Sequence, residues 1–163
     1  MNAEIAEEVR RLATLASEKG ITVCAAESCT GGLIGASITD YPGASAFFMG
    51  STVTYSNESK ERLLHVPRGI LFAYGAVSHQ TAVCMAEGAR VLYGADVSVA
   101  VTGIAGPGGG TSDKPVGLVY ISVSDGYMTQ ASEFRFTGSR GEVREATVLN
   151  ALRMLNALIS QIQ

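Results

Sequence analysis

The sequence predicts an α/β fold, a three-layer α/β/α sandwich around a mixed sheet of about five strands. Three observations support this prediction: helical and strand-like segments alternate along the first hundred residues, one strand-like run is apolar throughout, and two alternating strands follow each other near the C-terminus. The chain has 163 residues, enough for one well-buried core and too few to favour two ordinary domains. We therefore expect a single domain over residues 1–163.

The first forty residues are predicted to form a helix, a strand and a second helix. Apolar residues recur at helical spacing over residues 3–19, and Gly20 ends that helix. A β-branched strand over residues 21–26 then leads through small polar residues into a short helix. That helix stops near Asp40, where residues 40–43 have the composition of a turn.

A second strand and further helices follow. The aromatic and β-branched run over residues 46–55 predicts the strand. Ser56 is expected to cap a helix that continues to about Leu64. Ser78 is expected to cap a longer helix over residues 79–93.

The C-terminal part of the chain is predicted to contain three strands and a long helix. The continuous run of small apolar residues over 97–104 is typical of a strand buried on both faces. Residues 116–123 and 128–136 alternate as two strands joined by a hairpin. Ser139 and Glu142 form a capping box at the start of the final helix.

Composition and charge exclude several classes of protein. The net charge is −3, and the sequence lacks the excess of basic residues that is typical of a nucleic-acid binder, so a nucleic-acid partner is not expected. The first ten residues are acidic and do not resemble a secretory signal, and no apolar run approaches the ~20 residues that cross a bilayer. Cys24, Cys29 and Cys84 contain no Cys-x-x-Cys pair, which disfavours a disulfide framework and a zinc site. We therefore expect a cytoplasmic protein with no membrane partner.

The turn after the first strand concentrates the candidate chemistry. Ser28, Cys29 and two glycines lie where main-chain N–H groups at a helix start would face the Ser28 hydroxyl. A serine becomes a nucleophile when a base takes its proton, and Lys60, in the first turn of a predicted helix, is a candidate base. Desolvation and the helix N-terminus would both lower the pKa of Lys60 and populate its neutral amine. Tyr55 could orient that amine or relay the proton.

Each of these residues also has a plainer interpretation, which spacing alone favours. Ser28 would cap its helix, Lys60 would be a solvated helix residue and Tyr55 would cover an edge of the core. Cys29 competes for the role of nucleophile, because a thiol at a helix N-terminus has a lowered pKa. A buried cysteine more often behaves as a small apolar residue.

Two further segments could bind an anion. The glycine-rich loop over residues 103–110 follows the apolar strand, yet it lacks both the P-loop ending and the dinucleotide-binding spacing. Its glycines could equally serve a tight connection. Arg140 and Arg144 lie one helical turn apart, where they could bind a phosphate or carboxylate together or remain exposed at the helix start.

Four segments, in this order and over nearly the whole chain, resemble the CinA C-terminal domain family: residues 26–32, residues 54–57 with Lys60, residues 75–78, and residues 102–107 with 114–117. The resemblance implies nicotinamide-mononucleotide deamidase activity, also called PncC, which hydrolyses the carboxamide to nicotinic acid mononucleotide and ammonia. Many members of that family carry an additional molybdopterin-binding-like domain at the N-terminus. This chain therefore resembles the stand-alone amidase.

The resemblance also implies roles for the residues at matching positions. Ser28 matches the proposed nucleophile, and Tyr55 and Lys60 match its activating partners, with main-chain N–H groups of the turn meeting the oxyanion. Substrate is expected to contact Cys29, Thr30, Gly31, Thr102, Gly103, Gly106, Gly108, Arg140 and Arg144. We expect a pyridine nucleotide as substrate and neither a metal nor another cofactor.

A non-catalytic function stays open as the alternative, namely a nucleotide-binding or competence- and damage-linked interaction module that keeps the pocket without turnover. The presence of a nucleophile together with a base favours the enzyme. Apolar residues such as Val83, Val91 and Leu92 could serve an interface as easily as a core. We therefore expect a homo-oligomer, with a dimer favoured.

Overall fold

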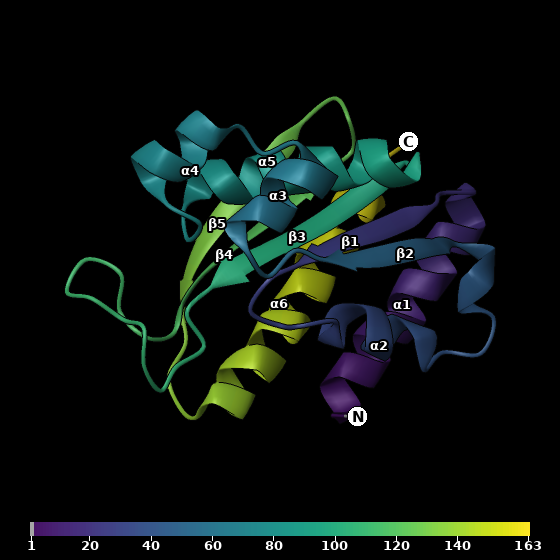
Figure 1. Ribbon diagram of the computed structural model, residues 1–163. Helices are drawn as coiled ribbons and strands as arrows, with labels where there is room; N and C mark the ends of the chain where they lie inside the picture. The colour runs from purple at the N-terminus through teal and green to yellow at the C-terminus, as the bar shows by residue number, and fades with distance from the viewer. Residues whose placement is uncertain (1) are drawn as a thin grey trace.

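The computed structural model describes residues 2–163, so that only Met1 of the expected domain lies outside the description. A five-stranded mixed sheet lies between two layers of helices (Figure 1), which confirms the predicted three-layer architecture. The strands are β1 (Val23–Glu27), β2 (Phe48–Val53), β3 (Val97–Gly103), β4 (Leu118–Ser124) and β5 (Thr129–Arg135). The helices are α1 (Ala3–Lys19), α2 (Leu33–Thr39), α3 (Asn57–Leu64), α4 (Arg68–Tyr74), α5 (His79–Tyr93) and α6 (Arg140–Gln161), with a 3-10 turn η1 (Ala44–Ala46).

The strand order of the sheet is β2-β1-β3-β4-β5. β1 runs parallel to β2 and β3, whereas β4 is antiparallel to β3 and β5. The first three strands therefore end at the same edge of the sheet, and the segments that follow them meet there. Every residue of β3 except Gly103 is buried, in agreement with its uninterrupted apolar run.

Two layers of helices cover the faces of the sheet. α1, α2 and α6 lie on one face, and α3, α4 and α5 lie on the other (Figure 1). The larger core, which includes Leu12, Ile34 and Leu155, lies under the first layer. A smaller core with Leu64 and Met85 lies under the second. Across residues 2–163, every helix is too short or too polar to span a lipid bilayer.

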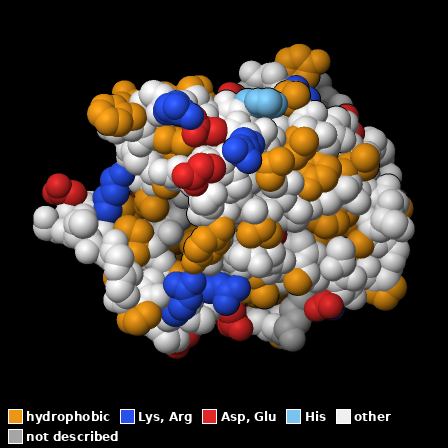
Figure 2. All heavy atoms as spheres, viewed as in Figure 1, with side chains coloured by type: hydrophobic (Ala, Val, Ile, Leu, Met, Phe, Trp, Pro, Cys, Tyr) orange, Lys and Arg blue, Asp and Glu red, His pale blue; other side chains and the backbone are white. Residues whose placement is uncertain are grey.

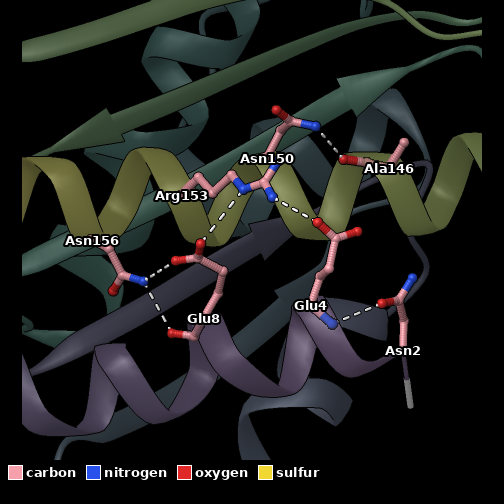
Figure 3. Close-up of polar contacts among 7 residues, drawn as sticks. All are labelled: Asn2, Glu4, Glu8, Ala146, Asn150, Arg153 and Asn156. Atoms are coloured by element: carbon pink, nitrogen blue, oxygen red, sulfur yellow. Dashed lines mark hydrogen bonds and ion pairs between the residues drawn. The ribbon is translucent and has the colours of Figure 1, made fainter.

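α1 and α6 pack side by side and share a polar cluster (Figure 3). Asn156 is buried, and its Nδ2 donates to the main-chain oxygen of Glu8 at 3.0 Å and to the Glu8 carboxylate at 2.8 Å. Arg153 forms ion pairs with Glu4 at 3.0 Å and with Glu8 at 3.5 Å. Directional contacts of this kind fix the position of α1 along α6, which apolar packing alone specifies less sharply.

The predicted helix ends agree closely with the structure. The helix expected over residues 3–19 is α1, and Gly20 ends it with a left-handed φ of 63°. Ser56, Ser78 and Ser139 cap α3, α5 and α6 through their hydroxyl groups, as expected. Helix ends are predictable here because a cap depends on the chemistry of a few neighbouring residues.

All five strands differ from their predicted bounds by one or two residues at one or both ends: β3 ends at Gly103, β4 covers Leu118–Ser124 and β5 covers Thr129–Arg135. The strand expected over residues 46–55 is shorter, because η1 takes its first residue and β2 covers only Phe48–Val53. The strand expected over residues 21–26 begins two residues later and ends at Glu27, since pairing with β2 and β3 on both sides continues through that residue. Glu27 thereby lies inside the sheet.

Candidate active site

Ser28 and Lys60 meet at the edge of the sheet where β1 and β2 end. Ser28 directly follows β1, and Lys60 lies near the start of α3, the helix that follows β2. Lys60 Nζ lies 3.1 Å from Ser28 Oγ, within hydrogen-bonding distance. The exposed fraction is 1% for Lys60 and 9% for Ser28. The two groups form a serine–lysine pair that is shielded from bulk water.

Burial lowers the pKa of Lys60 to about 8, because the ammonium group loses its hydration. Lys60 Nζ also donates to the main-chain oxygen of Thr54 at 2.7 Å. This acceptor directs one N–H bond of the amine away from Ser28, so that the lone pair of the neutral form can face the serine hydroxyl. The direction of the shift agrees with the sequence-based expectation, and burial is its main cause.

Glu27, not Ser28, caps the N-terminus of α2. The Glu27 side chain is fully buried and accepts hydrogen bonds from the main-chain N–H groups of Gly32 at 3.0 Å, Ile34 at 3.0 Å and Gly35 at 2.9 Å. The interpretation of Ser28 as the helix cap is therefore wrong, and its hydroxyl group is left for Lys60.

The Glu27 carboxylate accepts two hydroxyl hydrogen bonds in addition. Thr30 Oγ1 donates to it at 2.6 Å and Ser51 Oγ at 2.7 Å. Gly35 allows this close packing of α2 on β2, because a Cβ atom at that position would lie 2.9 Å from Ser51 Cβ. The carboxylate thus joins β1, the turn, α2 and β2.

The turn between Ser28 and α2 keeps two main-chain N–H groups unused. Gly31 N–H donates to the Ser28 carbonyl at 3.1 Å, and Arg144 Nη2 donates to the Thr30 carbonyl at 2.7 Å. Within the described part of the chain, the N–H groups of Cys29 and Thr30 have no acceptor. Neighbouring N–H groups beside a nucleophile can stabilise an oxyanion that develops there.

Cys29 is a poor candidate nucleophile in this environment. Its side chain is 6% exposed, and burial raises the pKa of the thiol to about 11. The lowering expected from a position near a helix start is outweighed by desolvation. The thiol is therefore protonated at neutral pH and lacks the thiolate that would attack a substrate.

A cleft of about 200 Å³ is lined on one side by Cys29, the residue that follows Ser28, whereas Ser28 and Lys60 do not line it. Arg140 spans it, because Nη1 donates to the Gly106 carbonyl at 2.9 Å and Nη2 to the Tyr55 hydroxyl at 3.2 Å. Figure 2 shows basic side chains gathered over the N-terminal part of α6, the helix that carries this arginine. The residues that line the cleft are Cys29, Tyr55, Gly103, Ile104, Ala105, Gly106, Gly108, Gly109 and Arg140.

Several other residues that were expected in the site form hydrogen bonds with the protein scaffold. Arg144 contacts the Thr30 carbonyl and does not share a partner with Arg140. The hydroxyl of Thr102 donates to the Ala76 carbonyl at 2.7 Å, and that of Thr30 to Glu27, so both hydroxyl groups support the scaffold. In the part of the chain that the structure describes, no hydrogen bond joins the Tyr55 hydroxyl to the serine–lysine pair.

Comparison with known proteins identifies the family of the chain. Residues 4–159 match the model of the CinA C-terminal domain. The chain belongs to this family. The CinA-family fold is also that of the competence/damage inducible protein CihA from Agrobacterium tumefaciens, with 44% identity, a TM-score of 0.95 and coverage of 99% of this chain and 98% of that one. A CinA superfamily protein from Klebsiella pneumoniae is 31% identical with a TM-score of 0.94, over 99% of this chain and 100% of that one.

The curated CinA relatives are longer proteins. A CinA-like protein from Geobacter sulfurreducens is 51% identical over 144 residues, which are 88% of this chain and 35% of that protein. A putative competence-damage inducible protein from Desulforudis audaxviator is 49% identical over 143 residues, with the same shares. The chain thus spans about a third of the length of the curated relatives it matches.

Two groups of this CinA-family site were not predicted from the sequence. Glu27 has the residue type of a solvated surface position and follows the predicted end of its strand, yet its carboxylate is central to the turn. The Thr54 carbonyl accepts a hydrogen bond from Lys60, but every residue has a main-chain carbonyl, so the residue type does not indicate this contact. The one available signal for Glu27 is its position directly before the candidate nucleophile.

Proposed function

We propose that this CinA-family domain is a cytoplasmic amidohydrolase that converts nicotinamide mononucleotide and water to nicotinic acid mononucleotide and ammonia, in pyridine nucleotide recycling. The observation that carries the proposal is the buried contact of 3.1 Å between Lys60 Nζ and Ser28 Oγ. A base whose pKa is lowered to about 8, beside a serine hydroxyl, is the arrangement that nucleophilic attack on an amide requires.

In the first half of the proposed reaction, neutral Lys60 takes the Ser28 proton directly while Ser28 Oγ attacks the carboxamide carbon. The carbonyl oxygen becomes an oxyanion, which the free N–H groups of Cys29 and Thr30 stabilise. When the carbon–nitrogen bond breaks, the Lys60 ammonium returns the proton to the leaving nitrogen. Ammonia departs and an acyl ester on Ser28 remains.

The second half repeats the same proton transfers with water. Lys60, neutral again, takes a proton from a water molecule, whose oxygen attacks the ester carbon. Collapse of the second oxyanion breaks the bond to Ser28 Oγ, and Lys60 returns the proton to the serine. The products are the carboxylic acid and the regenerated pair.

The cleft supplies the proposed binding site for the nucleotide. Arg140 already faces Gly106 and Tyr55 across the cleft, so we assign the substrate phosphate to this guanidinium and to the glycine loop with Gly103 and Gly108. In this assignment Tyr55 contacts substrate at the cleft wall, and proton transfer between Ser28 and Lys60 needs no relay.

The test is ammonia release from nicotinamide mononucleotide by the purified protein. S28A and K60A are expected to lower kcat at least 10³-fold, by loss of the nucleophile and of the base. S37A and K19A are matched controls, because Ser37 donates to the Leu33 carbonyl and Lys19 lies at the end of α1. Activity in S28A and K60A equal to that of the controls would contradict the mechanism.

Related substrates test the specificity and the alternative function. Nicotinamide riboside lacks the phosphate, so its KM is expected to rise at least tenfold over that of the mononucleotide, with R140A raising KM for the mononucleotide alone. Tight binding of the mononucleotide without any ammonia release would instead favour a non-catalytic nucleotide-binding module.

A further inference from the structure

The start of α2 is fully occupied by protein groups. Glu27 accepts the N–H groups of Gly32, Ile34 and Gly35, and the Leu33 N–H donates to the Thr30 carbonyl at 3.2 Å. A helix start normally offers such N–H groups to an anion or an oxyanion. Here the side chain just before the nucleophile removes them from the site.

The turn itself is held from two sides. On one side, the Thr30 hydroxyl donates to Glu27 at 2.6 Å. On the other, Arg144 donates to the Thr30 carbonyl at 2.7 Å, and Gly31 N–H donates to the Ser28 carbonyl at 3.1 Å. With these groups engaged, the N–H groups of Cys29 and Thr30 are those of the turn that have no acceptor, within the residues that the structure describes.

From this arrangement we propose that Glu27 is a positioning residue for the reaction. Its buried carboxylate draws the N–H groups of the α2 start away from the substrate and holds the turn so that the N–H groups of Cys29 and Thr30 form the oxyanion site. The inference rests on the proposed function, because it assigns a role relative to Ser28 as the nucleophile.

Two consequences distinguish positioning from structural support. A positioning role predicts that loss of the carboxylate slows the attack by each folded molecule, since the oxyanion donors are no longer aligned. A purely structural role predicts fewer folded molecules that react at the normal rate. The rate and the final extent of a covalent reaction at Ser28 separate the two.

The experiment uses a fluorophosphonate, whose phosphoryl oxygen occupies an oxyanion site when it reacts with a serine. Labelling of Ser28 is followed by mass spectrometry in the 163-residue wild type, in E27Q and in S37A as the matched control. The side-chain amide introduced by E27Q would present an NH₂ group to N–H donors, so this variant is expected to lower the labelling rate about 10²-fold with the same final extent. Its kcat for ammonia release should fall similarly while KM stays within about threefold.

A second variant keeps the proposal testable if E27Q does not fold. T30V is close in shape to wild type and removes a single hydrogen bond to the carboxylate, so it is expected to slow labelling about tenfold. A folded E27Q, or T30V in its place, that labels within threefold of S37A overturns the proposal.

The substrate assignment is judged separately. Slow labelling of E27Q with normal labelling of wild type supports the role of Glu27 even if the mononucleotide is not hydrolysed, in which case only the proposed substrate fails. Wild-type protein whose Ser28 does not label at all overturns the nucleophile and the role of Glu27 together.

Discussion

Lys60 is the residue whose chemistry depends most on its surroundings. Its side chain is almost fully buried, and its amine contacts a serine hydroxyl and a main-chain carbonyl. Among residues 2–163, Lys60 forms no ion pair with a carboxylate. Since an ammonium group is costly to bury, the neutral amine is more populated in Lys60 than in a solvated lysine at the same pH. The sequence offers only three lysines, and this one is suited to act as a base near neutral pH.

The pH dependence of the rate follows from this pKa. The base must be neutral to accept the serine proton, so kcat/KM for ammonia release should rise about tenfold per pH unit below pH 8 and level off above it. Initial rates between pH 6 and pH 9.5 measure the profile. A rate that is flat or falls across this range would contradict the assignment of Lys60.

Stability should respond to the same group. The pKa of Lys60 is lowered from 10.5 to about 8 on folding, so the unfolded chain binds more protons between these two values. The contribution of Lys60 to the free energy of unfolding therefore rises with pH through this window and is least favourable below pH 8. Urea unfolding of wild type and K60M at several pH values isolates it: the difference between them should change in the wild type's favour as pH rises.

Replacement of Cys29, unlike that of Ser28 or Lys60, is expected to leave most of the activity intact. Because the pKa of its thiol is raised to about 11, C29A should keep at least half of the wild-type kcat, with the main-chain N–H of residue 29 intact. Iodoacetamide at pH 8 should leave the activity of wild type unchanged. Inactivation by the reagent together with a tenfold loss in C29A would make the thiol the nucleophile.

The sequence singles out some residues of the site and hides others. Ser28 and Lys60 are singled out by the resemblance to the CinA family, because spacing alone favours a helix cap and a solvated lysine at these positions. Glu27 is not, since its burial depends on five donors contributed by the turn, by α2 and by β2. Such a network becomes visible only when the segments are brought together.

Among the elements, helices were predicted more accurately than strands. Caps such as Ser78 and Ser139 are local, whereas the end of β1 at Glu27 depends on pairing with β2 and β3. The apolar run over residues 97–104 was informative because the central position of β3 buries both of its faces. Strand limits therefore depend on neighbours that the local pattern does not identify.

The contact between α1 and α6 allows a test at this scale. N156A removes the Nδ2 donor from the partly buried Glu8 and is expected to lower the free energy of unfolding by about 1–3 kcal/mol. R153A removes more exposed ion pairs and should cost less than about 1 kcal/mol. Urea denaturation of both variants compares them, and equal losses would contradict the importance of the buried contact.

The whole molecule exposes several large apolar side chains on α4 and α5, within the layer formed by α3, α4 and α5. Phe72 is 93% exposed and Val91 is 72% exposed, with Leu92 on the same helix as Val91. Isolated exposed apolar residues are common, whereas a contiguous exposed apolar patch is typical of an association surface, and we expect these residues to contribute to one.

The oligomeric state expected from the sequence can be measured directly. Light scattering after size exclusion should give twice the mass of one chain, and the introduction of a charge by V91E should shift the mass toward that of a monomer if this surface forms the contact. A single-chain mass for wild type at all concentrations would contradict the expected dimer.

The hydrogen bond from Arg144 to the Thr30 carbonyl joins positions 114 residues apart. A ribosome makes Ser28 and Lys60 before it reaches α6. The growing polypeptide therefore carries Ser28 and Lys60 before Arg144, which contacts the turn, and Arg140, which lines the cleft, have been translated. If the proposed function holds, a chain truncated before α6 contains Ser28 and Lys60 but neither Arg140 nor Arg144, and it is expected to release no ammonia from nicotinamide mononucleotide.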